Sequence, residues 1–239
     1  MYNPLTVIVF CLFSLLTGVA SAAEPFIHPG MLHTQEQLDA IKQRVKDGKQ
    51  PWAAAWDSLR SSRGASVDFT PEPFAHVVRG PYGKPSIGDR QLSRSARAAY
   101  THALQWVITG DPAHADKAIE ILNAWSNVLW TFQDNDAKLL AAWTGDDFCN
   151  TAEILRYTDS GWREKDIVQF ERMLRTVYYP LLERFFPEAN GNWDGAILNT
   201  MLCIGIFCDD REIFDRAVTN YLHGRANGGI TKYIYPSGQ

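Results

Sequence analysis

Two amphipathic helices joined by a tight turn are predicted for residues 92–129, LSRSARAAYTHALQWVITGDPAHADKAIEILNAWSNVL. Apolar residues recur at helical spacing in both halves: Leu92, Ala96, Ala99, Ala103 and Val107, then Ala118, Ile121, Leu122, Trp125 and Leu129. Gly110 ends the first helix. Asp111-Pro112 starts the second, because Asp is a favoured N-cap and Pro a favoured first helical residue. The stretch therefore predicts a helical hairpin.

The same pattern continues on both sides of this hairpin. Thr34 and Gln37 form a capping box before residues 38–45, and apolar stripes follow over 139–155, 167–177, 197–204 and 214–221. No stretch shows sustained strand alternation. We expect an all-α fold, an incomplete α/α toroid built from helical hairpins. A tetratricopeptide-type solenoid is disfavoured, because no strict period of roughly 34 residues is visible.

The N-terminus has the features of a signal peptide. Residues 5–19 are apolar and uncharged, too short to span a bilayer comfortably, and end in Ala20-Ser21-Ala22. A membrane anchor or an intracellular core helix is the alternative. We expect cleavage after Ala22, a mature domain over residues 23–239, no membrane association after cleavage, and a periplasmic or secreted protein.

The composition and motifs limit the classes of partner and cofactor that are expected. The net charge of −4 does not indicate a general polyanion-binding surface, so nucleic acid is not expected and an acidic substrate would need a local basic cleft. Cys149, Cys203 and Cys208 are expected in the core. No motif indicates a metal site, a cofactor, nucleotide chemistry or serine hydrolysis. The oligomeric state is not indicated.

A Pro- and Gly-rich break covers roughly residues 63–90. A loop of this length is either a lid or binding loop, or a surface excursion without function. Arg79, Tyr82 and Lys84 lie in it. If the substrate is a polyanion, these three residues are candidates for contacting it.

The loop Asn190-Gly191-Asn192-Trp193-Asp194 lies between two expected helices. Carboxamides donate hydrogen bonds to a carboxylate, and Trp193 offers a flat apolar face to a sugar ring. The alternative is a helix start, with Asn192 or Asp194 as N-cap and Trp193 in the core. Near the end of the chain, Tyr233 and Tyr235 are candidate proton donors or stacking residues, or simply packing aromatics.

Two further groups have structural interpretations. The acidic pairs Asp146-Asp147 and Asp209-Asp210 are interpreted as helix starts, which the helix dipole favours. The tryptophans on apolar stripes are expected in the core: Trp106, Trp125 and Trp143.

Four segments together resemble the alginate lyase family. They are residues 26–34 (FIHPGMLHT), 118–126 (AIEILNAWS), 152–156 (AEILR) and 190–193 (NGNW), with Asp209-Asp210 and Phe214-Asp215 following in the same order. The resemblance covers essentially the whole expected mature chain. It implies an α/α toroid and β-elimination on a uronic-acid polymer such as alginate, with an acidic polysaccharide as partner.

The resemblance also implies catalytic roles for individual residues. In the family, side chains neutralise the uronate carboxylate so that the C5 proton becomes acidic, and His or Tyr serves as base and acid. Asn192 matches the neutralising Asn, with Asn190 as the match if the register is off by two. The chain departs from the pattern in having Trp193 where some members have His. It also ends at Gln239, before the Glu-, Arg- and His-bearing motif and a later catalytic Tyr, so we expect a fragment whose site is incomplete.

Two other functions fit the composition. A glycoside hydrolase on a similar toroid would need two carboxylates at a cleft, for which Asp146, Asp147 and Asp194 are the candidates. A non-catalytic helical carbohydrate-binding protein would use tryptophans as stacking platforms.

Overall fold

The computed structural model describes residues 24–188, 191–224, 228–232 and 234. This part of the chain is mainly helical, which confirms the all-α prediction. The helices are α1 (Gln35–Lys46), α2 (Trp52–Arg60), α3 (Asp89–Thr109), α4 (Pro112–Val128), α5 (Ala137–Arg156), α6 (Glu164–Met173), α7 (Tyr179–Leu182), α8 (Gly191–Phe207) and α9 (Arg211–His223). A π-helical turn, Leu174–Tyr178, lies between α6 and α7 where Pro180 interrupts the regular pattern.

The caps that mark these helices are those expected from the sequence. Thr34 and Gln37 form the capping box of α1, and Asp111 accepts a hydrogen bond from the Ala113 amide at the start of α4. Asp210 does the same for α9, accepting from the Ile213 amide. Each cap satisfies a backbone donor that the first helical turn leaves without a partner.

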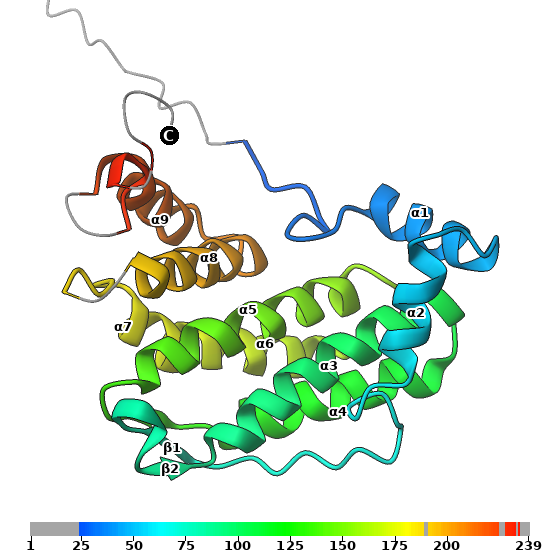
Figure 1. The fold of residues 1–239 in the computed structure, drawn as a ribbon, viewed down its shortest axis with the longest axis horizontal. Coiled ribbons are helices and arrows are strands. Elements are labelled where there is room, and N and C mark those ends of the chain that lie inside the picture. The colour runs from blue at the N-terminus through cyan, green and yellow to red at the C-terminus, as the bar shows by residue number, and fades with distance from the viewer. Residues whose placement is uncertain (1–23, 189–190, 225–227, 233, 235–239) are drawn as a thin grey trace, which may run out of the picture.

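The helices form two layers (Figure 1). Helices α3, α5 and α8 lie side by side in one layer, and α4 and α6 lie behind them as the second members of hairpins. Thr200 of α8 donates to the Ala142 carbonyl of α5, and Cys203 Sγ lies 3.5 Å from Asp146 Oδ1. The two helices therefore run parallel. Parallel inner helices with outer return helices form the α/α toroid arrangement that was predicted.

A small sheet, which the sequence did not indicate, joins the loop before α3 to the loop before α5. Strands β1 (His76–Arg79), β2 (Ser86–Ile87) and β3 (Thr131–Gln133) lie in the order β2-β1-β3. β1 pairs antiparallel with β2 and parallel with β3. Strands of two to four residues are too short for alternation to reveal them. The sheet fixes much of the 63–90 segment beside the N-terminal ends of α3 and α5.

The core lies between the two layers, with α5 at its centre. Trp125, Phe148, Phe170 and Phe207 are fully buried, which confirms the core prediction for Trp125. It was wrong for Trp143, which is 46% exposed. Most residues of α5 are buried, so Trp143 marks the side of this helix that the described part of the chain leaves open.

The remaining core predictions have mixed outcomes. All three described cysteines are buried and free, as expected. Trp106 is only half-buried and donates to Thr158. The pair Asp146-Asp147 lies in the middle of α5 and not at a helix start, so the helix-dipole interpretation was wrong there.

The N-terminal segment packs across the ends of α5 and α9. The His28 ring lies between the Glu153 and Asp209 carboxylates, at 2.6 and 3.2 Å, and stacks on Tyr157. The predicted signal peptide lies outside the described residues. Among those described, none of the helices combines the length and apolarity needed to cross a membrane.

Candidate active site

The exposed side of the α3–α5–α8 layer, here called the inner face, holds the candidate site. Its exposed or half-buried residues recur at helical spacing on each helix: Arg90, Arg94 and Arg97 on α3, Trp143, Asp146 and Asp147 on α5, and Asn192, Gly195 and Asn199 on α8. This face is polar, basic on α3 and acidic on α5, while the opposite faces of the same helices form the core.

Asn192 lies in the first turn of α8 and its side chain is exposed. Asp194, two residues on, is fully buried and accepts a hydrogen bond from the Phe186 amide at 2.6 Å. Asp194 thereby anchors the segment that leads into α8. In this turn, Asp194 is therefore buried, and the side chain of Asn192 is exposed to solvent.

Trp193 belongs to an aromatic and basic group at the same end of the layer. It is half-buried, with its ring 5.0 Å from that of Phe186 in an edge contact. Lys138 of α5 donates to the Phe185 carbonyl at 2.8 Å, and its ammonium lies 5.3 Å from the Phe186 ring. Burial lowers the pKa of Lys138. Trp193 is thus packed against an aromatic neighbour and is not part of the buried core.

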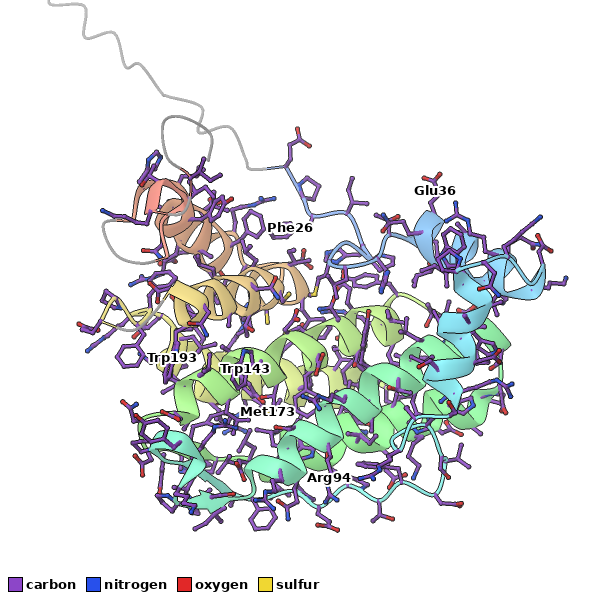
Figure 2. All side chains as sticks on the ribbon, in the orientation of Figure 1. Phe26, Glu36, Arg94, Trp143, Met173 and Trp193 are labelled. Atoms are coloured by element: carbon purple, nitrogen blue, oxygen red, sulfur yellow. The ribbon has the colours of Figure 1, made fainter. Side chains whose placement is uncertain are left out.

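Arg79 approaches the inner face from the sheet. Its guanidinium lies 5.6 Å from the ring of Trp143, which Figure 2 shows on α5 in front of the outer layer. Asp89 lies 3.9 Å from Arg79, and Arg79 Nε is buried with no hydrogen-bond partner among the described residues. The loop residue therefore brings a positive charge and an unused donor beside an exposed tryptophan.

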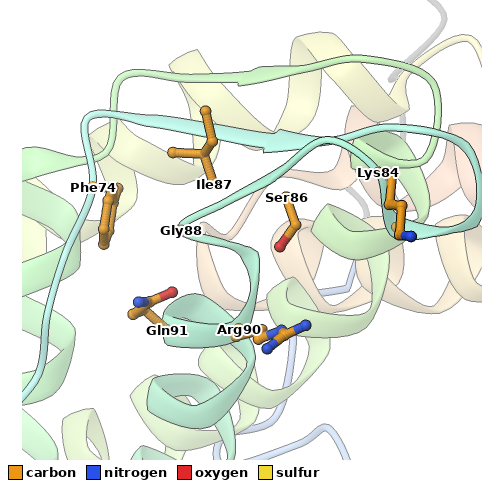
Figure 3. Close-up of a pocket in the computed structure, with 8 residues that line it drawn as sticks. Phe74, Lys84, Ser86, Ile87, Gly88, Arg90 and Gln91 are labelled. Carbon is orange, nitrogen blue, oxygen red and sulfur yellow. The ribbon is translucent and has the colours of Figure 1, made fainter.

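The other two loop candidates lie elsewhere. Tyr82 is fully exposed, with a positive φ of 57° in the turn between β1 and β2. Lys84 lines a hollow of about 550 Å³ beneath the β1–β2 hairpin, together with Arg90 (Figure 3). Arg79 is thus the loop residue whose guanidinium lies beside Trp143.

A second hollow lies beside the middle of α3 and was not anticipated. It measures about 660 Å³ and is lined by Ser62, Arg63, Gly64, Phe69, Arg94, Arg97, Ala98, Tyr100, Thr101 and Asp147. Burial, then the negative charge of Asp146, raises the pKa of Asp147 to about 6, while Arg97 opposes the shift. The sequence did carry a signal: Arg90, Arg94, Arg97 and Thr101 recur at helical spacing opposite the apolar stripe that was recognised.

Three predicted residues, Asn190, Tyr233 and Tyr235, lie outside the described residues. Within the described part of the chain, no group of three His, Cys, Asp or Glu side chains forms a metal site.

Comparison with known proteins identifies the family. The alginate lyase family model matches residues 87–232, from β2 to beyond α9. A Tyr-to-Phe variant of alginate lyase A1-III complexed with a tetrasaccharide superposes with a TM-score of 0.57 at 16% identity, over 78% of this chain and 56% of that one. An alginate lyase from Bacteroides ovatus gives a TM-score of 0.55 at 13% identity, over 89% and 69%. No curated protein sequence matches.

The chain thus spans little more than half the length of the first of these structures. At these identities the structural likeness establishes the fold, and the family model covers more than half of the sequence. The chain belongs to the alginate lyase family.

Proposed function

We propose that this protein is a polysaccharide lyase that cleaves a uronic-acid polymer such as alginate by β-elimination. The observation that carries the proposal is the exposed carboxamide of Asn192 in the first turn of α8, on the same inner face as Trp143 and Arg79. The family membership and the named structural relatives support it. Export through a signal peptide over residues 1–22, and a mature domain from residue 23, belong to the same proposal.

The chemistry explains why these groups suit the reaction. In β-elimination, a base removes the C5 proton of a uronate, the C5–H electrons form the C4–C5 double bond, and the C4–O4 bond breaks as O4 takes a proton. The charged carboxylate on C5 opposes proton loss until hydrogen-bond donors neutralise it. Asn192 donates through its amide, and the positive end of the α8 dipole favours the carboxylate at the same point.

Arg79 and Trp143 suit substrate positioning. The guanidinium pairs with a carboxylate, and the exposed indole offers an apolar face to a sugar ring. Because Trp143 is 46% exposed on a helix that is otherwise mostly buried, it is available to a ligand at no cost in core packing.

Hydrolysis is the second candidate function, favoured by the raised pKa of Asp147, which suits a general acid. Its proposed partners are less suitable: Asp194 is fully buried, and Asp146 accepts from Asn150. A purely carbohydrate-binding role would show affinity without turnover.

Product spectroscopy decides between these functions. The protein, expressed from its complete open reading frame, is incubated with alginate and with other polyuronates. Elimination creates an unsaturated uronate that absorbs in the ultraviolet, in step with new reducing ends. New reducing ends without that absorbance would show hydrolysis, and binding without either product would show a carbohydrate-binding protein.

A further inference from the structure

The hollow beside α3 is a built site and not a gap between loosely placed side chains. Its outer wall is the segment 62–69, which side chains of α3 and α4 hold in place. Gln105 donates to the Ala65 carbonyl at 3.1 Å, His102 to the Ser66 carbonyl at 3.2 Å, and Lys117 to the Phe69 carbonyl at 2.8 Å. The wall is therefore anchored at several points along its length, as a preorganised binding site requires.

Close backbone packing fixes the same wall. Gly64 lies against Ala98 of α3, where an added Cβ would meet the Ala98 Cα at 3.1 Å. The backbone next to Arg63 is consequently held against the helix. The hollow of about 660 Å³ is within the range of about 300–1,000 Å³ typical of ligand sites.

The charges in this hollow favour an anion. Arg63, Arg94 and Arg97 line it against a single carboxylate, Asp147. Arg94 lies 3.8 Å from Glu72. Among the described residues, the side chains of Arg63 and Arg97 make no ion pair or hydrogen bond, although the charge of Arg97 lowers the pKa of Asp147. Two guanidinium forks thus remain for a ligand, in a protein whose net charge is −4.

The rest of the lining suits a sugar. Phe69 and Tyr100 add aromatic surface to the hollow, and the Tyr100 hydroxyl is held 2.6 Å from His33 Nε2. A planar guanidinium binds a carboxylate through two parallel hydrogen bonds, and an aromatic ring packs against the apolar face of a pyranose.

The hollow is separate from Asn192, which does not line it, and Asp147 joins it to the inner face. Trp143 stands one helical turn before Asp147 on α5, and α5 lies between α3 and α8. A polymer bound at Asn192 and Trp143 has to extend from α5 onto α3 to contact Arg97.

We propose that Arg63 and Arg97 form a distal subsite that binds the carboxylate of a uronate residue away from the point of cleavage. This inference rests on the proposed function. Its consequence is that long acidic chains bind more tightly than short ones, because only a long chain fills both places.

The test uses titration calorimetry on the Asn192→Ala protein, which the proposed function predicts to bind without cleaving. Combining Arg63→Ala with Arg97→Ala should weaken binding of a long oligouronate by roughly tenfold to a hundredfold, the effect of losing a charged hydrogen bond. A short oligouronate and a carboxyl-reduced oligosaccharide should bind with unchanged affinity. Arg97→Lys, which keeps the charge but not the fork, should fall between.

Arg163→Ala is the matched control, because Arg163 is an exposed arginine on the outer layer, paired with Asp166. It should leave every affinity unchanged. The inference is overturned if the double variant binds the long oligouronate as its parent does, if it loses the carboxyl-reduced chain equally, or if the parent binds no oligouronate. If elimination is absent but the arginine dependence is found, the proposed function fails and the subsite stands.

Discussion

The guanidinium of Arg79 lies over the indole of Trp143, 5.6 Å from its centroid, and so joins the 63–90 segment to the inner face of α5. The two residues come from elements separated by the whole of α3 and α4. Their contact places one residue of this segment beside an exposed side chain of α5. That the segment borders a substrate groove stays a prediction.

Replacing Trp143 or Trp125 by alanine should affect the stability of the protein differently. Trp143→Ala removes a ring that is 46% exposed and contacts Arg79, so the unfolding free energy should fall by about 1 kcal/mol at most, while affinity for a uronate oligomer falls. Trp125→Ala empties a fully buried site and should cost about 3–5 kcal/mol of stability. Urea unfolding and calorimetric binding measure both. Equal stability losses would contradict the exposed position of Trp143.

Asn192→Ala should lower the rate of elimination by roughly a hundredfold to a thousandfold, equivalent to about 2.7–4 kcal/mol, because one preorganised donor is lost. The melting temperature should hardly change. Asn127→Ala is the control, since Asn127 is an exposed asparagine on the outer helix α4. If Asn192 only supports the helix start, the variant will instead lose about 0.5–2 kcal/mol of stability and keep its turnover.

Gly145, where α5 packs against α8, should be required for the close approach of the two helices. A Cβ on Gly145 would lie 2.5 Å from Thr200 Cγ2 and 3.1 Å from Tyr178 Cδ1, so Gly145→Ala should destabilise by about 1–3 kcal/mol. Gly195→Ala, on the inner face of α8 with nothing within 4 Å, should stabilise by about 0.5–1 kcal/mol because alanine loses less entropy in a helix. Chemical unfolding of the two variants compares them directly. A stable Gly145→Ala protein would refute this close approach.

The buried His102 should make the fold sensitive to acid. Burial, then the neighbouring His114, lowers the pKa of His102 from 6.5 to about 4. Between those values the unfolded chain binds a proton that the folded chain does not. This contribution to stability is therefore complete above pH 6.5 and is lost progressively as pH falls toward 4.

His102→Gln offers the matching test, because glutamine keeps an N–H for the Ser66 carbonyl but does not titrate. Unfolding free energies across this pH range should rise less steeply with pH in the variant than in the parent. Identical slopes would show that His102 has the same pKa in the folded and unfolded protein, contradicting the lowered pKa.

Export should be visible at the N-terminus of the mature protein. The cleavage expected after Ala22 makes Ala23 the first residue, and packing of the fold begins just beyond it: the Glu24 carbonyl accepts from Arg211, and Phe26 lies 3.8 Å beneath the same guanidinium. Mass spectrometry of the purified native protein checks this. A chain that retains Met1 would contradict export by cleavage.

Much of the fold could be predicted from local patterns. The capping box at Thr34, the Asp111-Pro112 start of α4 and the buried stripe through Trp125 depend on chemistry within a few residues. Helical period identifies which side chains share a face, and cap residues identify where a helix begins. The helical class and the order of the hairpins follow from these alone.

The arrangement of the inner face depended on the tertiary structure. Trp143 looks like a core residue by period, yet it is 46% exposed, because the described helices do not bury that side of α5. The hollow formed by Arg63, Arg97 and Asp147 joins three elements distant in the sequence. A sequence specifies the faces of its helices, but which face meets solvent is decided by how the helices pack against one another.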